Sequence, residues 1–184
     1  MLEIRYDNDK IKRFERELAG FPRNSLPKVM SRGLNRTATE ARTRASRLLS
    51  QKLGVKVKDI RERVTLQRAS YSKWRSFVKI SRRRIPLISF GARQTKKGVT
   101  YKKEGERILI RHAFKATMKS GHTGVFKRKF SSRLPISELR GPSLGQVFVG
   151  TPELAKLLAD ISMQRLSKNI NDQVRLILNA RLPA

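Results

Sequence analysis

Apolar residues recur every three or four positions along several stretches of the chain, which is the spacing of one face of an α-helix. The longest N-terminal stretch runs from Asn24 to Leu53. Pro27 suits its first turn, and Gly54 follows its last apolar residue as a stop signal. Two further short helices are predicted, one from Asp7 to Gly20 and one around the segment "KDIRER". We therefore expect residues 7–63 to be helical. The apolar stripe of the long helix comprises Leu26, Val29, Met30, Leu34, Ala38, Ala41, Ala45, Leu48 and Leu49.

The C-terminal stretch has the same period. Thr151 is a candidate N-cap, Pro152 takes the first helical position and Glu153 complements the positive end of the helix dipole. These signals predict a helix over 152–182 that packs against the helix over 24–53, or against the same helix of a neighbouring copy. Its apolar stripe comprises Leu154, Leu157, Leu158, Ile161, Leu166, Ile170, Val174, Ile177 and Leu178.

Between residues 64 and 150 the apolar residues are arranged differently. The segments "VTLQRAS", "KWRSFVKIS", "GVTYKK" and "QVFVG" are short, rich in β-branched and aromatic residues, and bounded by Gly, Ser or Lys, as strands are. Pro86 restricts "RIPLISF" to an edge strand or a loop, and "RILIRHAFKATM" suits either a buried strand or a helix.

These patterns together predict an α+β fold, with two long amphipathic helices packed with a central antiparallel β-sheet or partial barrel. No linker or internal repeat divides the chain, so we expect residues 1–184 to form one domain. It would consist of the helical part over 7–63, a β-rich part over 64–150 and the C-terminal helix.

Charge narrows the class of function. The chain has 43 Lys and Arg against 14 Asp and Glu, a formal net charge of +29. Such an excess is self-repelling unless an anion neutralises it, which indicates nucleic acid or an acidic protein surface as the partner. No helix-turn-helix, zinc-finger or RNP pattern accompanies the charge, so any nucleic-acid contact is predicted to be independent of sequence.

The cations are concentrated between Tyr71 and Arg140, a region that contains 20 Lys and Arg but only three Glu. This region contains four runs of consecutive basic residues, in "SRRR", "TKK", "YKK" and "FKRK". We expect these four runs to contact phosphates of duplex DNA. The aromatic residues among them, Trp74, Phe77, Tyr101 and Phe126, are expected in the core. The predicted contact residues are Arg82, Arg83, Arg84, Lys96, Lys97, Lys102, Lys103, Lys127, Arg128 and Lys129.

Catalytic and metal chemistry find little support. The chain has no cysteine, its two histidines are His112 and His122, and its acids are scattered mainly over the helices. A zinc site or a two-metal nuclease site would be hard to assemble from them. No carboxylate lies near His122 in the sequence to tune it as an acid or base. We therefore expect neither an enzyme nor a cofactor or metal, and no apolar run reaches the length of a membrane span.

Two neighbouring segments combine glycine, proline and basic residues. "KSGHTGVFKRK" (Lys119–Lys129) lacks the Gly-Lys-Ser/Thr ending of a phosphate-binding Walker A loop, so it is interpreted as a turn that leads into a basic strand. "RLPISELRGPS" (Arg133–Ser143) contains Gly141 and Pro142, which indicate a bend. The first segment also places Ser120, Gly121, His122 and Gly124 in or beside its turn.

The string "IPLISFGARQTKKGVTYKKEGERILIRHAFKATMKSGHTGVFKRK", followed by "RLPISELRGPS", resembles the minor tail protein Z family of long-tailed bacteriophages and prophages. Several separated segments recur in the same order and at similar spacing, roughly from Ile85 to Ser143. The flanking helices agree only in kind.

The resemblance implies a structural tail-completion protein at the head-proximal end of the tail. The implied assembly is a homo-oligomeric ring, expected to be a hexamer, whose interface loop comprises Ser120, Gly121, His122, Gly124, Gly141 and Pro142. Other tail proteins (tail terminator, tape measure or tail tube) and the head-tail connector would be its partners, in the virion tail and, during assembly, in the host cytoplasm. Double-stranded DNA would be contacted without sequence preference. The alternative is a free, sequence-independent nucleic-acid-binding protein, which composition alone would favour.

Overall fold

The computed structural model describes residues 25–103 and 105–179. The short helix expected from Asp7 to Gly20 and the last residues of the expected C-terminal helix lie outside them. The chain divides into two compact units, which we call the helical unit and the β-rich unit and describe separately. The expectation of one domain over 1–184 stays a prediction. The described residues of the helical unit are 25–45, 64–80 and 152–179, and those of the β-rich unit are 46–63, 81–103 and 105–151.

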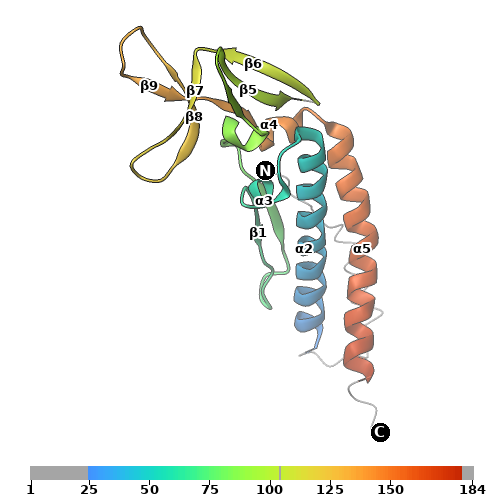
Figure 1. Ribbon diagram of the computed structural model, residues 1–184. Coiled ribbons are helices and arrows are strands. Elements are labelled where there is room, and N and C mark those ends of the chain that lie inside the picture. Colours follow the sequence, from blue (N-terminus) through green and yellow to red (C-terminus); the bar gives the residue numbers. More distant parts are fainter. Residues whose placement is uncertain (1–24, 104, 180–184) are drawn as a thin grey trace. The chain divides into compact units, whose positions relative to one another are not determined.

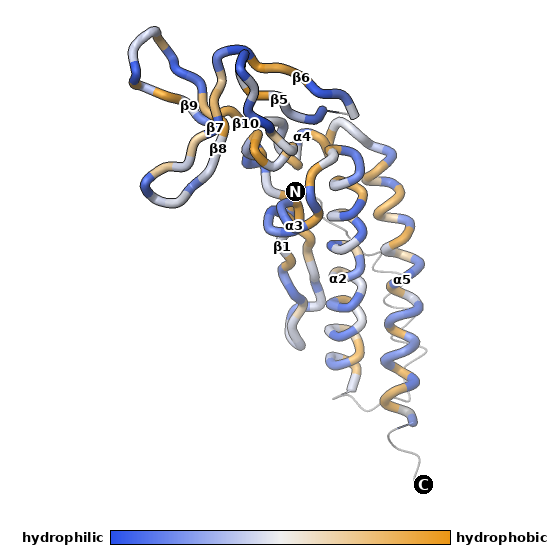
Figure 2. Tube along the Cα trace, viewed as in Figure 1, coloured by the Kyte–Doolittle hydropathy of each residue, from blue (hydrophilic) through white to orange (hydrophobic). Residues whose placement is uncertain are grey.

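Two long helices dominate the helical unit, as the apolar stripes predicted. Helix α2 (Leu26–Leu53) contributes its N-terminal part to this unit and lies beside α5 (Pro152–Asn179) (Figure 1). Hydrophobic and hydrophilic positions alternate along both helices (Figure 2). The strands β1 (Val64–Gln67) and β2 (Phe77–Ile80) complete the unit as an antiparallel hairpin.

The contact between α2 and α5 combines apolar burial with close backbone approach. Val29 and Met30 form a buried cluster with Ile170. A Cβ atom added to Gly33 would lie 2.8 Å from the Ile170 Cγ1 atom, so only glycine permits this spacing. One turn further along α2, the Asn169 Nδ2 atom donates a hydrogen bond of 3.0 Å to the Thr37 Oγ1 atom. The predicted packing of the two helices is therefore confirmed.

Polar residues share the buried face of α5, which the apolar stripe did not indicate. Ser162 and Asn169 are each 2% exposed, whereas Leu157 of the predicted stripe is 46% exposed. The buried positions Leu154, Leu158 and Ser162 are spaced by four residues and lie on one helix face. Leu157 is one position off that face, so its assignment to the buried stripe was wrong.

The hairpin is attached to α2 by side-chain hydrogen bonds to its backbone. The Asn35 Nδ2 atom donates to the Ala69 carbonyl at 3.0 Å, and the Ala69 N–H donates back to Asn35 Oδ1 at 2.8 Å. The Arg42 Nε atom donates to the Val64 carbonyl at 2.7 Å. These bonds satisfy backbone groups of the hairpin that have no partner strand.

The β-rich unit is built from short antiparallel strands. Its sheets are β3–β10, β4–β5–β6 and β7–β8–β9. Counting β1–β2, the described residues form four small sheets, none of them closed into a barrel. The α+β class is confirmed, with several small sheets where a central sheet or partial barrel was expected. The bounds are α3 (Val57–Arg61), β3 (Arg84–Pro86), the 3-10 helix η1 (Leu87–Phe90), β4 (Arg93–Thr95), β5 (Gly98–Lys103), β6 (Glu106–Arg111), β7 (Ala113–Thr117), β8 (Thr123–Arg128), β9 (Ile136–Glu138), β10 (Arg140–Ser143) and α4 (Leu144–Val149).

Two local predictions are settled by backbone features. The ambiguous segment "RILIRHAFKATM" forms the two strands β6 and β7, separated by His112 with a φ of 60°, a left-handed conformation that breaks either a strand or a helix. The segment "QVFVG" was predicted as a strand and is wrong, because it belongs to α4. Ser143 and Gln146 form a reciprocal capping box at the start of that helix, which outweighs the β propensity of its valines.

The core of the β-rich unit joins η1 to two sheets. Leu87, Val99, Ala113 and Val125 form a buried cluster. Gln94 links the sheets through its amide, because Oε1 accepts a hydrogen bond from the Lys115 N–H at 2.8 Å while Nε2 donates to the Gly98 carbonyl at 3.1 Å. The strands that carry the basic runs are therefore fixed to a common core.

Candidate functional site

All ten predicted DNA-contact residues are exposed and belong to the β-rich unit. They lie at four places: before and at the start of β3, in the β4–β5 turn, at the end of β5, and at the end of β8 with the residue after it. Among the residues that the structure describes, none of the ten takes part in an ion pair. Their positive charge is therefore available to an external anion.

Strand geometry separates cations that are adjacent in the sequence. Lys102 and Lys103 are consecutive in β5, so their side chains leave opposite faces of the β4–β5–β6 sheet. Lys127 and Arg128 diverge in the same way on β8. Arg128 turns to the face that carries Phe114, and its guanidinium carbon lies 5.6 Å from the centre of that ring. The basic runs of β5 and β8 thus each supply cations to more than one surface.

The β4–β5–β6 sheet brings together cations that are separated in the sequence. Lys102 lies opposite Arg107, Arg93 opposite Thr100, and Arg111 opposite Gly98. Paired and next-but-one positions share a face, so four exposed cations stand on one side of the sheet. We call this set the cationic sheet face: Arg93, Lys102, Arg107 and Arg111.

The four cations of the cationic sheet face repel one another, and few nearby groups compensate their charge. Lys102 and Arg107 are like charges at directly opposite positions, an arrangement that destabilises a sheet. The Arg107 Nη1 atom donates to the Thr100 hydroxyl at 3.1 Å, a neutral partner that holds the guanidinium but leaves its charge uncompensated. Lys102 of "GVTYKK" and Arg107 and Arg111 of "ERILIR" were visible in the sequence, but the pairing register was needed to align them.

The predicted interface loop falls in two places. Ser120, Gly121 and His122 belong to the turn between β7 and β8, where the Met118 N–H donates to the His122 carbonyl at 2.8 Å. Gly121 has a φ of 79°, which favours glycine. Gly124 follows inside β8, and a Cβ atom there would lie 2.9 Å from the Phe126 ring. The other two residues, Gly141 and Pro142, lie in β10.

His122 has a carboxylate partner that is distant in the sequence. Its Nε2 atom lies 2.8 Å from Glu138 Oε1, and Arg140 Nε donates to Glu138 Oε2 at 3.0 Å. The Glu138 side chain is only 13% exposed. The expectation that His122 lacks a nearby carboxylate was therefore wrong, because the pairing of β8 with β9 brings residues 16 apart in sequence into contact.

This contact joins the two motifs "KSGHTGVFKRK" and "RLPISELRGPS". Burial alone would raise the pKa of the Glu138 carboxyl, but hydrogen bonds from His122 and Arg140, with the positive charge of Arg140, outweigh it and lower that pKa below 4.5. Glu138 is therefore an ionised acceptor held by two donors. The arrangement fixes the β7–β8 turn and β10 to the same carboxylate.

No metal-binding group of three or more acidic or histidine side chains occurs among the described residues. Within the same part of the chain, no helix combines the length and apolar character needed to cross a bilayer.

Comparison with known proteins supports the resemblance seen in the motifs. The family model described as prophage minor tail protein Z (GPZ) matches residues 11–180. A protein of Escherichia phage N15 named tail completion protein is 24% identical over 170 residues, which cover 88% of this chain and 92% of that relative. No solved structure matches. Because the family model spans nearly the whole chain, the protein belongs to the prophage minor tail protein Z family and is a structural component of the phage tail rather than an enzyme.

Proposed function

We propose that this protein completes the head-proximal end of a long phage tail, so that the tail can join a DNA-filled head. The name of the phage N15 relative supports this role, and the alignment with it covers most of both chains. In this proposal the protein acts in the virion tail after assembly in the host cytoplasm.

The proposed DNA contact is carried by one observation, the cationic sheet face. Four exposed cations share one side of a three-stranded sheet, and two of them are directly opposed like charges. Such a surface is self-repelling until an anion covers it, and the phosphate backbone offers regularly spaced anions regardless of sequence. Genome DNA that enters or passes the tail must be accepted whatever its sequence, and backbone contacts meet that requirement.

The proposed assembly is a ring, with six copies as the expected number. Phage tails have rotational symmetry, and a contact between two different patches of the same chain closes into a ring when its rotation fits. The β7–β8 turn and β10, fixed through Glu138, are the proposed contact elements. The neighbouring components would be the head-tail connector and the tail terminator, tape measure or tail tube.

Deletion of the gene tests the role in tail completion. We expect tails of normal appearance in electron micrographs, a large loss of infectious particles, and rescue when the protein is supplied from a plasmid. Normal infectious yield without the protein would refute the role. Absence of the protein from purified particles would instead favour a free nucleic-acid-binding protein.

Salt-dependent binding to duplex DNA tests the contact surface. Changing Arg93, Lys102, Arg107 and Arg111 together to Gln should weaken binding to all sequences alike. It should also reduce the slope of log K against log[salt] by about 0.9 for each phosphate that the variant no longer neutralises.

The matched control removes four exposed cations of the helical unit, Arg44, Lys156, Lys168 and Arg175, by the same substitution. This control should retain most of the slope. Equal loss in both variants would show that net charge alone drives binding and would contradict the proposed surface.

A further inference from the structure

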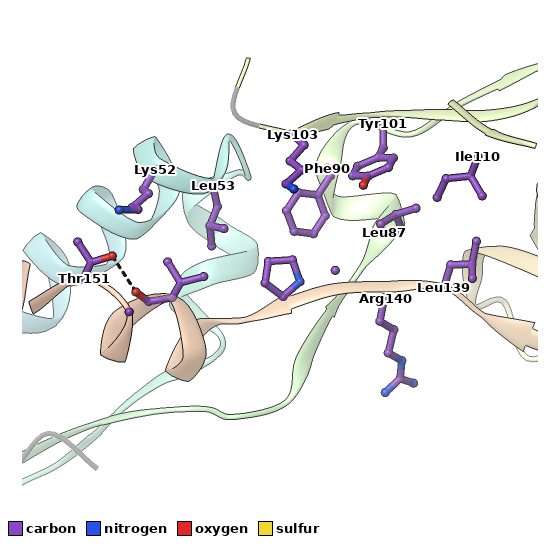
Figure 3. A pocket seen from close by; sticks show the side chains of 14 residues that line it. Lys52, Leu53, Leu87, Phe90, Tyr101, Lys103, Ile110, Leu139, Arg140 and Thr151 are labelled. Carbon is purple, nitrogen blue, oxygen red and sulfur yellow. Dashed lines mark hydrogen bonds between the residues drawn. The ribbon is translucent and has the colours of Figure 1, made fainter. Parts of the chain in front are cut away.

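The β-rich unit contains a pocket of about 550 Å³ whose lining includes no residue of the cationic sheet face. Its walls come from the end of α2, η1, β5, β6, the β9–β10 segment and α4. In Figure 3 the side chains of Leu87, Phe90 and Tyr101 converge on the cavity, and Leu53 enters it from α2. Ile110 and Leu139 lie at its other side. The interior is therefore mostly apolar and has the size of a binding pocket.

The pocket is shaped by the β10 backbone. A Cβ atom on Gly141 would lie 2.7 Å from the Phe90 ring, so the absence of a side chain allows β10 to lie directly against that ring. Phe90 in turn meets Tyr101 edge-on, with ring centres 6.4 Å apart and an interplanar angle of 84°. The Gly141 backbone and the two rings therefore define one wall of the cavity.

The charged groups around the pocket are positive. Lys103 projects toward the cavity and Lys52 lies at its edge (Figure 3), and neither takes part in an ion pair among the described residues. Arg140 points away from the cavity (Figure 3), in the direction set by its contacts with Glu138. No carboxylate is among the residues that line the pocket in the described part of the chain. An occupant must therefore combine an apolar group with negative charge.

We propose that this pocket receives an apolar or aromatic side chain from a partner protein, carried on a segment whose flanking residues are acidic. The apolar anchor fills the cavity between Leu53, Phe90 and Tyr101, while flanking carboxylates pair with Lys52 and Lys103. A buried anchor surrounded by a charged rim is the usual arrangement of a protein interface. This docking site rests on the proposed tail role only in that the role requires partner proteins.

Two other occupants fit less well. Duplex DNA presents phosphates outside and keeps its bases stacked, so it offers no apolar group to fill the cavity. A second copy of this chain has 14 Asp and Glu against 43 Lys and Arg, so it offers few carboxylates that could pair with the positive rim. An acidic protein segment with an apolar side chain matches both the apolar interior of the pocket and its positive rim.

Synthetic peptides test the pocket without any phage component. Three peptides of equal length are titrated into the full-length protein by calorimetry: one with a single Phe between acidic residues, one with Ala in place of Phe, and one with Phe between lysines. We expect the acidic Phe peptide to bind about tenfold more tightly than either of the others, since the anchor and the ion pairs both contribute. Amide NMR shifts should fall on residues that line the pocket, such as Tyr101, Ile110 and Leu139.

A charge reversal locates the binding. Lys52→Glu with Lys103→Glu should weaken the acidic Phe peptide by about tenfold or more, whereas Lys96→Glu with Lys97→Glu, an exposed pair in the β4–β5 turn, should change it by less than about twofold. Unchanged melting curves show that both variants remain folded. If the pocket variant melts early, Lys52→Gln with Lys103→Gln provides the same comparison.

The proposal would be overturned by no binding of the acidic Phe peptide, by equal binding of the Ala peptide or of the Phe peptide with lysines, or by equal weakening from both charge reversals. Self-association of the wild type that disappears only in the pocket variant would also overturn it, because the occupant would then be a second copy. A failure in gene-deletion rescue has no bearing on these titrations, so the proposed function and the docking site can fail separately.

Discussion

The α2–α5 contact and the β4–β5–β6 sheet of this tail protein handle charge in opposite ways. In the helical unit, Arg36 lies 3.7 Å from Glu40 and 3.9 Å from Asp172, and Arg165 lies 3.8 Å from Glu40. In the β-rich unit, Lys102 faces Arg107 across two strands with no acid between them. Exposed pairs of the first kind contribute little each, but they remove repulsion where two helices meet. The ion pairs between α2 and α5 thus support the helical unit itself, whereas the uncompensated cationic sheet face is the surface proposed to bind a partner.

Substitution of Ile170 by Asp should have the largest effect on this contrast. Ile170 is 4% exposed and lies against Gly33 and Met30, so a carboxylate there would be buried without a partner. We expect a loss of about 3 kcal/mol or more in the free energy of unfolding, measured by urea denaturation. Leu176→Asp on the same helix, at a position 59% exposed, is the control and should change stability little. Similar denaturation midpoints for the two variants would disprove the packing.

Asn169→Ala should have the next largest effect. The change removes the 3.0 Å hydrogen bond to Thr37 from the buried α2–α5 contact. We expect a loss of about 1–3 kcal/mol, seen as a lower Tm. Gln164→Ala, at an exposed position of α5, should leave Tm nearly unchanged. Equal melting of both variants would mean that the buried hydrogen bond does not stabilise the helical unit.

Glu138→Gln tests the best-paired charge of the β-rich unit. Because the folded-state pKa of Glu138 is lowered, its ionised form stabilises the fold above the ordinary value of 4.5, and this contribution is lost as the pH falls through the lower pKa of the folded state. We expect the free energy of unfolding at neutral pH to be about 1 kcal/mol higher for the wild type than for the variant. The difference is small because both donors are partly exposed, and water weakens their interaction with the carboxylate.

The difference between wild type and Glu138→Gln should therefore shrink as the pH drops below 4.5. The measurement is a series of urea denaturation curves from about pH 7 to about pH 3. A difference that stays constant over this range would contradict a role for the ionised carboxylate.

Lys102→Gln should give the smallest change in the free energy of unfolding, and it should stabilise the protein where the other substitutions destabilise it. Removal of the like-charge pair with Arg107 should raise the free energy of unfolding by about 0.2–1 kcal/mol while it weakens DNA binding. Lys97→Gln, in the β4–β5 turn, has no opposing cation in the strand register and serves as the control. If Lys102→Gln destabilises the protein instead, the charge of Lys102 serves the fold rather than a partner.

Features set by local sequence were predictable. The stripe from Leu26 to Leu49 and the start signal at Thr151 and Pro152 predicted both long helices, because an amphipathic face is recorded in the spacing of its residues. The one clear error in element type, "QVFVG", came from weighing its valines above the Ser143 and Gln146 capping box. Both residues were visible in the sequence.

Features set by strand pairing were not predictable. The contact of His122 with Glu138 depends on the pairing of β8 with β9. The cationic sheet face depends on the register of β5 with β6. A shift of one residue in that register would turn Arg107 to the other side of the sheet. The pocket likewise depends on the meeting of Gly141 and Phe90, which are 51 positions apart and carry no local signal of each other.

The close approach of Gly33 to Ile170 has a mechanical consequence. Together with the Asn169–Thr37 hydrogen bond, it fixes two consecutive residues of α5 against two residues of α2 that are one helical turn apart. A slide of one residue, about 1.5 Å, would stretch the hydrogen bond, and a slide of about one turn would bring Ile170 against Val29 or Thr37, which carry side chains. These two contacts therefore act as an axial lock that opposes sliding of α5 along α2.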